Sequence, residues 1–242
     1  MRVVLWGANG AMGKLLQARL GEQVVGRVSL DGENGAAVSA DRLPDCKPDM
    51  ILDFSHHSSA PELVAYARKT GCACVIGTTS HTPEEKALIE QAAQTLPIFY
   101  AGNVSLGIAV LCRLAKQAAA AFPNADIEIV EIHHNQKLDA PSGTALALAQ
   151  AIREVRPAAT LVPGRSGHAK RQKDDIGIHA LRMGNVVGIH EVHVCTGTQT
   201  ITLRHEAHDR SLFADGALDA ARFLLGKPAG LYQMQDLLKE ES

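Results

Sequence analysis

The first hundred residues alternate short apolar runs with amphipathic stretches. Apolar runs that predict buried strands lie at 2–7, 24–30, 49–55, 72–78 and 97–102. Apolar positions with helical spacing lie between them, at 11–21, 60–71 and 82–96. Repeated strand–helix units are typical of a parallel sheet with helices on both faces. This half is therefore predicted to be a Rossmann-like, doubly wound α/β domain.

The pattern changes in the second half of the chain. Helices are predicted at 106–122 and from about Ser142 to Val155, and between them 126–134 alternates acidic with aliphatic residues, as a half-exposed strand does. The polar, glycine-rich segment 163–177 is interpreted as a mobile loop. Three strand-like runs of antiparallel character follow, at 178–184, 186–196 and 198–208. We expect an α+β domain with a mixed or antiparallel sheet, after which a helix at 213–226 returns to the first sheet.

Composition narrows the class of protein. The chain has 242 residues, of which 46% are hydrophobic and 21% charged, and its formal net charge is −2. So small a charge gives no reason to expect nucleic acid or an anionic membrane as partner. The five cysteines are an odd number, the amino terminus enters a strand directly, and no apolar run reaches membrane-spanning length. We therefore expect a cytoplasmic protein with free thiols.

A glycine-rich turn joins the first predicted strand to the first predicted helix. Its sequence is GANGAMG, from Gly7 to Gly13, with the spacing G-x-x-G-x-x-G. Glycines permit a tight turn and let the backbone approach a pyrophosphate, and the helix start supplies free N–H groups for it. The strand before and the helix after this turn favour a dinucleotide site over a turn without a ligand.

An acidic residue after the second strand would complete such a site by holding the adenosine ribose. Asp31 is the best-placed candidate, and Glu33 is the alternative. No arginine directly follows Asp31, which favours NADH over NADPH. Three later strands are predicted to end at the same edge of the sheet, at Asp53 to Ser55, Gly77 to Thr79 and Ala101 to Ser105. Taken singly, each of these segments is more typical of an ordinary turn.

The densest group of chemically active residues is EIHHNQKLDAPSGTAL, residues 131–146. His133 and His134 end a strand, so only one of them faces a given substrate atom. Lys137 lies in the turn that follows. The helix starting near Gly143 and Thr144 offers free N–H groups to a carboxylate. These residues suit the reduction of an acidic, nitrogen-containing compound, because hydride addition to a C=N or conjugated C=C bond leaves a neighbouring atom that needs a proton.

Eleven histidines make a metal site conceivable, but their spacing argues against one. The adjacent pair at the strand end lacks the i, i+4 spacing of a helical zinc site. His190 and His193 fall on opposite faces of a strand, as do His205 and His208, so these four are interpreted as surface or interface residues. We expect no metal.

The segment at 131–145 resembles the signature E-x-H-H-x-x-K-x-D-A-P-S-G-T-A of the dihydrodipicolinate reductase family at every fixed position. GANGAMG, DFS, VIGTT and AGNVS are similar to that family's cofactor elements, in the same order. RMGNVVGIHEV, HDRSLFADGA and GLYQMQDLL resemble its later segments, so the similarity covers essentially the whole chain.

The resemblance implies an NADH- or NADPH-dependent reduction of 4-hydroxy-tetrahydrodipicolinate, a small dicarboxylate, to tetrahydrodipicolinate in lysine and diaminopimelate biosynthesis. It implies that His133 is the acid/base, that Lys137 donates a proton, and that His134, Gly143 and Thr144 bind substrate. The cofactor-binding residues would then be Gly7, Ala8, Asn9, Gly10, Ala11, Met12, Asp31, Gly77, Thr78, Thr79, Ala101, Gly102, Asn103 and Val104.

The family resemblance also implies a homotetramer built by the sheet of the second domain, and domains that close over substrate. We expect residues 1–104 and 211–242 to form the dinucleotide-binding domain, and residues 105–210 the domain for substrate binding and oligomerisation. Two departures from the family pattern leave cofactor preference open: SLDGEN lacks the acid–arginine pair of many members, and Val104 stands where an aromatic residue is usual.

Two other functions compete with the reductase. A metal-dependent hydrolase would use the histidines, hold zinc and act without nicotinamide. A non-catalytic nucleotide sensor would be expected to lose His133 or Lys137 first, and both are present. The reductase is the favoured hypothesis.

Overall fold

The computed structural model describes residues 1–43 and 45–239. The chain forms two compact units: Met1–Ser105 with Ser211–Ser242 make up unit 1, and Leu106–Arg210 make up unit 2. Residues 240–242, which the sequence analysis assigns to the first domain, lie outside the described part. Among the described residues, none of the helices combines the length and the apolar character that crossing a membrane demands.

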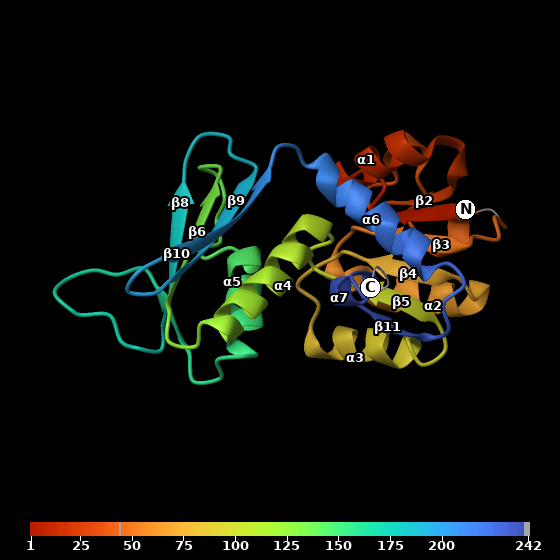
Figure 1. The fold of residues 1–242 in the computed structure, drawn as a ribbon. Coiled ribbons are helices and arrows are strands. Elements are labelled where there is room, and N and C mark those ends of the chain that lie inside the picture. Colours follow the sequence, from red (N-terminus) through yellow and green to blue (C-terminus); the bar gives the residue numbers. More distant parts are fainter. Residues whose placement is uncertain (44, 240–242) are drawn as a thin grey trace. The chain divides into compact units, whose positions relative to one another are not determined.

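Unit 1 is built on a parallel sheet with the strand order β11-β5-β4-β3-β1-β2 (Figure 1). The strands are β1 (Val3–Trp6), β2 (Val24–Val28), β3 (Met50–Asp53), β4 (Ala73–Ile76), β5 (Pro97–Tyr100) and β11 (Gly230–Tyr232). The helices are α1 (Ala11–Leu20), α2 (Ala60–Thr70), α3 (Pro83–Ala92), α6 (Ser211–Leu224) and α7 (Met234–Leu237). Single 3₁₀ turns lie at Gly21–Gln23, Glu33–Gly35, Ala40–Arg42 and His57–Ser59.

Both faces of this sheet are covered, which explains why its strands read as continuous apolar runs. Ile51, Cys74 and Ile98 on one face share a core with α2 and α3. On the other face, Phe99 of β5 meets Phe223 of α6 edge to face, with ring centroids 6.1 Å apart. The predicted doubly wound α/β fold is confirmed.

Local sequence patterns predict some elements of unit 1 better than others. The start of α3 is a capping box, in which Thr82 Oγ1 accepts from Glu85 N and Glu85 Oε2 accepts from Thr82 N. That pattern is readable in the sequence. Strand β11 was missed, because its three residues carry no alternation and it becomes a strand only by pairing with β5.

Unit 2 carries a second sheet with the order β10-β9-β6-β8-β7. Its strands are β6 (Asp126–His133), β7 (Thr160–Pro163), β8 (Asp175–Arg182), β9 (Gly188–Cys195) and β10 (Thr200–Ala207). Helices α4 (Leu106–Ala121) and α5 (Gly143–Arg153) pack against each other, α4 along β9 and β10 and α5 against β6 (Figure 1). Ile127 and Ile129 of β6 lie in the core beneath them.

The second sheet is mixed, and one expected pairing is wrong. The runs at 178–184 and 186–196 read as antiparallel neighbours, yet β8 pairs in parallel with both β6 and β7. Strand β6 lies between β8 and β9 and pairs with β9 antiparallel. The segment between β7 and β8 is also shorter than the predicted loop, and Arg171 anchors its end by donating to Ile127 O at 3.2 Å.

Asp53, the last residue of β3, is a buried carboxyl that gives a testable pH dependence. It is 2% exposed and accepts from Ser55 Oγ at 2.5 Å. Burial raises the pKa of Asp53 from 3.8 to about 6, against the opposing effect of the hydrogen bonds from Ser55 and Thr78. Because the pKa of Asp53 is higher in the folded state, ionisation of Asp53 lowers the free energy of unfolding. This loss of stability is absent well below pH 3.8 and grows until about pH 6.

We expect Asp53→Asn to stabilise the protein above that window, by up to about 3 kcal/mol, and to lose this advantage as the pH falls toward 4. Urea denaturation of both proteins at several values between pH 4.5 and pH 8 measures the difference. Asp41→Asn, at an exposed position, is the control. A difference in unfolding free energy that stays constant with pH would show that Asp53 is ionised at no cost.

Candidate active site

The loop after β1 and the helix that follows it each require a glycine. The N–H groups of Gly7 and Ala8 both donate to Val28 O, at 2.9 and 3.0 Å. Gly7 has a φ of +81°, and a Cβ there would lie 2.4 Å from Phe54 O. A Cβ on Gly13 of α1 would lie 2.3 Å from Gly7 O. Gly7 therefore lets the loop pass close to the backbone after β3, and Gly13 lets loop and helix approach each other closely, which is the geometry that a pyrophosphate site needs.

The start of α1 is open to an anion. Its N-cap is Gly10, which has no side chain to accept from the first-turn N–H groups. Ala8 is buried and its carbonyl accepts from Gln17 Nε2 at 2.8 Å, so Ala8 supports the loop from inside. Ala11 is exposed and Met12 half-buried, at the helix start where the sequence predicts cofactor contacts.

Asp31 is held in place beside the glycine loop. Asn9 Nδ2 donates to Asp31 Oδ1 at 2.5 Å and to Glu33 O at 3.0 Å, and Glu33 N donates to Asp31 Oδ1 at 3.1 Å. The Asn9 side chain and the Glu33 backbone lower the pKa of Asp31, so its carboxylate is charged at neutral pH. Glu33 thus contributes its backbone to fixing Asp31.

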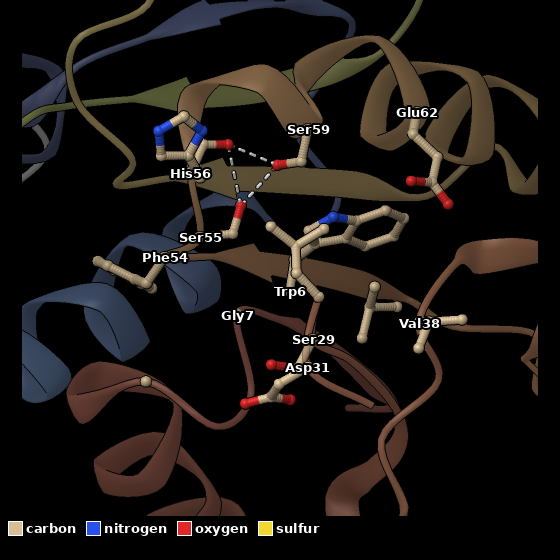
Figure 2. A pocket seen from close by; sticks show the side chains of 13 residues that line it. Trp6, Gly7, Ser29, Asp31, Val38, Phe54, Ser55, His56, Ser59 and Glu62 are labelled. Atoms are coloured by element: carbon tan, nitrogen blue, oxygen red, sulfur yellow. Dashed lines mark hydrogen bonds between the residues drawn. The ribbon is translucent and has the colours of Figure 1, made fainter. Parts of the chain in front are cut away.

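Asp31 and Gly7 line a hollow of 320 Å³ in unit 1. Figure 2 shows Asp31 close to Gly7, and Ser55, His56 and Ser59 as a hydrogen-bonded group on the other side of the hollow. Ser55 Oγ lies 2.7 Å from Ser59 Oγ, which donates to His56 O at 2.7 Å. A charged acid and hydroxyl groups around an apolar hollow suit a nucleoside.

A second hollow of 240 Å³ lies at the carboxyl ends of β4 and β5. It is lined by Met12, Phe54, Gly77, Ala101, Gly102, Asn103, Val104 and Phe213. Of the residues predicted to bind cofactor at the ends of β4 and β5, Gly77 and Ala101 to Val104 line this hollow, and Thr78 and Thr79 do not. Thr78 is buried and its Oγ1 accepts from Ser55 N at 2.8 Å, and the methyl group of Thr79 lies beside Gly102.

Sequence reasoning missed three aromatic residues that line these hollows: Trp6, Phe54 and Phe213. Trp6 and Phe54 each stand at a strand end, next to a turn that the sequence did mark. The sequence therefore indicates where Trp6 and Phe54 lie, but not that they line a hollow. Phe213 comes from α6, more than a hundred residues later in the chain, and no local signal points to it.

Unit 2 has a cluster of polar side chains at the end of β6, on the same face of the strand as its core residues. Glu131 and His133 follow Ile127 and Ile129 at alternate positions, so all four side chains lie on one face. The register places His190 of β9 opposite Glu131. It places Arg182 of β8 opposite His133. Three strands thus bring charged and titratable groups together at one end of the sheet.

Glu131 is at the centre of this cluster and is fully buried. Arg182 donates two N–H groups to it, to Oε2 at 3.0 Å and to Oε1 at 2.8 Å. Ser142 N donates to Oε1 at 3.0 Å, and His133 Nδ1 contacts Oε2. Burial raises the pKa of Glu131, but hydrogen bonds from Arg182, His133 and Ser142 outweigh it, so the pKa lies below the ordinary value.

The two buried histidines meet edge to face, with ring centroids 5.1 Å apart. Burial lowers the pKa of His133, although Glu131 opposes the shift. Burial and the neighbouring His133 lower the pKa of His190 to about 4, so His190 is neutral at physiological pH. The interpretation of His190 as a surface residue is wrong: it is 4% exposed, because it shares the core face of β9 with Val192 and Val194.

Lys137 lies in the turn after β6. Its backbone N–H donates to His134 O at 3.2 Å, and its Nζ donates to Asp139 Oδ1 at 2.7 Å. Lys137 also acts electrostatically on His133. His134 follows His133 in the strand direction, and its Nε2 lies 3.5 Å from Arg210 Nη2.

Helix α5 begins at the same place. Ser142 is its N-cap: Ser142 Oγ accepts from Ala145 N at 3.2 Å and lies 3.2 Å from His190 Nε2. Gly143 is exposed, and no atom lies within 4 Å of the place where its side chain would begin. Thr144 is the next residue of the first turn. The helix start is thus accessible to a carboxylate.

The geometry of Glu131, His133 and His190 allows one test of the metal alternative. Their ligand atoms lie within 4.8 Å of one another. However, the Glu131 carboxylate already accepts from Arg182, Ser142 and His133. A cation would have to displace a guanidinium group and then lie beside it. The donor set therefore does not suit a metal ion, and the absence of a metal stays a prediction.

Two family models match the chain. The model described as "Dihydrodipicolinate reductase, N-terminus" matches residues 1–104, and that described as "Dihydrodipicolinate reductase, C-terminus" matches residues 107–238. The 4-hydroxy-tetrahydrodipicolinate reductase of Alkaliphilus metalliredigens is 41% identical over 244 residues, which cover 98% of this chain and 99% of that protein. The enzyme of the same name from Caldanaerobacter subterraneus subsp. tengcongensis is 42% identical, covering 99% of each chain.

Solved structures agree with the sequence matches. A dipicolinate-bound dihydrodipicolinate reductase from a Paenisporosarcina species superposes with a TM-score of 0.80 at 28% identity, covering 96% of this chain and 97% of that one. An aspartate dehydrogenase from Thermotoga maritima has a TM-score of 0.53 at 14% identity, covers 94% of this chain, and shares the fold alone. Together, the two family models and the full-length relatives show that the chain belongs to the dihydrodipicolinate reductase family.

Proposed function

We propose that this protein is an NADH- or NADPH-dependent oxidoreductase that reduces 4-hydroxy-tetrahydrodipicolinate to tetrahydrodipicolinate in lysine and diaminopimelate biosynthesis. The observation that carries the proposal is the folding of the signature segment into one cluster, where His133, Lys137 and the start of α5 surround the end of β6. Relatives that cover the whole chain bear the name of this activity.

The nicotinamide cofactor, when bound, supplies a hydride. The glycine loop and Asp31 fit its pyrophosphate and adenosine ribose, and the hollow lined by Gly77 and Ala101 to Val104 fits the remainder. The substrate carries a 4-hydroxyl group that the product lacks, so this group leaves as water, and the hydride and one proton complete the reduction. His133 and Lys137 handle the proton, His133 as acid/base and Lys137 as donor. Both lie on the strand end and turn that Glu131 and Asp139 hold in place.

The carboxylates of the substrate are assigned to His134, Gly143 and Thr144. A helix N-terminus binds anions through its free N–H groups and its dipole, and the open space at Gly143 admits one. The structural relative with bound dipicolinate supports a dicarboxylate ligand. His190 stays outside this assignment, because it is buried and turned toward Ser142.

A coupled assay tests the activity. The purified protein receives freshly made dihydrodipicolinate synthase product, and loss of absorbance is followed with NADH and NADPH in parallel. Oxidation of either cofactor is the expected result. If neither is oxidised while NADH still binds, the protein is a nucleotide sensor or reduces another compound. Activity that requires zinc and proceeds without nicotinamide would favour the hydrolase instead.

The charged Asp31 is expected to favour NADH, because its carboxylate repels a 2′-phosphate. In the variant Asp31→Ala, we expect the NADH to NADPH ratio of kcat/KM to fall by roughly five- to tenfold, the effect of one charge contact in water. Glu33→Ala is the matched control, since Glu33 acts on Asp31 through its backbone. An unchanged ratio in Asp31→Ala, or an equal change in both variants, would contradict this assignment.

We propose that residues 1–104 and 211–242 act as the cofactor domain and 105–210 as the substrate and oligomerisation domain. The protein is then a homotetramer, joined through the face of the second sheet opposite α4 and α5. Val130 and Ile132 lie half-buried on that face, and Leu181 is 40% exposed. Light scattering after gel filtration measures the mass in solution. The cysteines are free, which fits a reducing, cytoplasmic location.

A further inference from the structure

Glu131 is a carboxylate with no exposed surface beside the groups proposed to move protons. A buried charge persists only where donors surround it, and here Arg182, Ser142 and His133 do so. Because the side chain does not reach solvent, it has no direct contact with substrate. Its influence on the reaction has to pass through the residues that it holds.

The ionisation of Glu131 determines where the proton of His133 lies. Glu131 is ionised, since the hydrogen bonds from Arg182, His133 and Ser142 outweigh the effect of burial and lower its pKa. An ionised carboxylate only accepts hydrogen bonds, so Nδ1 of His133 must carry the hydrogen. In the neutral ring, Nε2 is then the nitrogen with a free electron pair. Gly188 leaves room beside it, since a Cβ there would lie 3.2 Å from Nε2.

The Glu131 carboxylate is also connected by hydrogen bonds to the turn that carries Lys137 and to the start of α5. Arg182, which binds both oxygens of Glu131, also donates to the carbonyl of Asp139 at 2.6 Å. Asp139 accepts from Lys137, so the turn that carries Lys137 is tied to Glu131 through Arg182. Ser142, whose N–H group donates to Glu131, is the N-cap of α5.

We infer that Glu131 is a positioning residue for the reaction: it fixes the tautomer of His133 with the hydrogen on Nδ1, aims Nε2 at the substrate, and sets the register of the Lys137 turn and the α5 start. Arg182 acts with it by keeping it ionised. The inference deepens the proposed function, because it rests on His133 as the acid/base.

Two simpler roles make different predictions. If Glu131 and Arg182 served only as a buried ion pair, loss of the pair would change stability and leave the proton positions of His133 as they are. If Glu131 were a metal ligand, its replacement would abolish metal binding, and wild-type activity would require the metal. The tautomer of His133 separates the positioning role from both.

The experiment compares wild type with Glu131→Gln by ¹⁵N NMR of the histidine rings and by steady-state kinetics. The ring ¹⁵N shifts distinguish the two tautomers, and His133→Asn assigns the His133 signals. In Glu131→Gln we expect a mixture of tautomers, because the side-chain amide both donates and accepts. We expect kcat to fall on the order of 10²-fold and KM to change by much less, since Glu131 does not touch the substrate and acts on binding only through the α5 start.

The pH profile gives an independent readout. The charged and titratable groups around His133 are Glu131, Arg182, Lys137 and His190. Glu131 raises the pKa of His133, so its replacement by glutamine leaves the opposing cations uncompensated. The titration of His133 is therefore expected to move to lower pH in Glu131→Gln. Glu131→Asp keeps the charge and should restore both the Nδ1–H tautomer and part of the turnover.

Glu131→Gln leaves the half-buried Arg182 without its partner and destabilises the fold, so the double variant Glu131→Gln with Arg182→Gln removes both charges. If this variant folds, the inference predicts that its tautomer is still mixed and its turnover still low. A structural ion pair predicts that turnover returns with the fold. Turnover close to wild type in the double variant would overturn the inference.

The tautomer readout keeps the two proposals separate. A wild-type protein that oxidises neither cofactor, but whose Nδ1–H tautomer is lost in Glu131→Gln, would refute the proposed reductase and leave the effect of Glu131 on His133 established. An active wild type in which Glu131→Gln leaves the tautomer and the His133 titration unchanged would refute the positioning role alone.

Discussion

Replacing His133 or Lys137 by alanine is expected to lower kcat by roughly 10²- to 10⁴-fold, the usual contribution of a positioned acid or base. The affinity for NADH should stay close to that of wild type, because the residues predicted to bind the cofactor lie in unit 1. Steady-state kinetics on the dihydrodipicolinate synthase product give kcat, and fluorescence titration gives the Kd for NADH.

The two variants are expected to differ in their effect on stability. His133 is buried and bound to Glu131, so His133→Ala also leaves space in the site and weakens the fold. Lys137 lies in a turn and contacts Asp139, so Lys137→Ala should fold normally. Lys69→Ala, at an exposed position of α2, controls for the loss of a lysine. Loss of NADH binding in both site variants would refute the assigned division of roles.

Gly13→Ala is expected to weaken NADH binding by at least about tenfold and to lower the unfolding free energy by roughly 1–3 kcal/mol. The added Cβ would lie 2.3 Å from Gly7 O and 2.5 Å from Ala8 O. Both contacts are with backbone, which cannot rotate away as a side chain can. Helix α1 must then move off the loop, and the N–H groups predicted to bind the pyrophosphate move with it.

Isothermal titration with NADH and urea denaturation measure the two effects of Gly13→Ala. Gly197→Ala is the matched control, because no atom lies within 4 Å of the place where its Cβ would be. Gly197→Ala should leave both quantities near wild type. Unchanged NADH affinity in Gly13→Ala would show that the loop does not hold the cofactor in this form.

The sequence was sufficient for features whose cause is local. The helix predicted at 82–96 begins with a capping box that depends on Thr82 and Glu85, three residues apart. The strand at β6 follows from alternation, and that alternation also puts Glu131 and His133 on one face. The family and fold class were likewise readable, because the signature segment is continuous in the chain.

Features that depend on distant pairing were not readable. The sequence places His190 in a strand but does not show that it lies opposite Glu131. Only the register of β9 against β6 shows this. The parallel pairing of β8 with β6 escapes the same local pattern, since alternation does not specify which strand lies beside which. The role of Glu131 also needed the structure, because its partner Arg182 lies about fifty residues further along the chain.

Unit 1 is formed by two segments that are separated in the chain by unit 2, and this affects the order in which the units can fold during synthesis. Residues 106–210 are continuous and can fold while the ribosome is still adding later residues, but unit 1 needs α6 and β11, which come after them. Until β11 is synthesised, the outer edge of β5 has no strand beside it. Newly made chains therefore expose an unpaired strand edge during this interval, when chaperone binding would matter most.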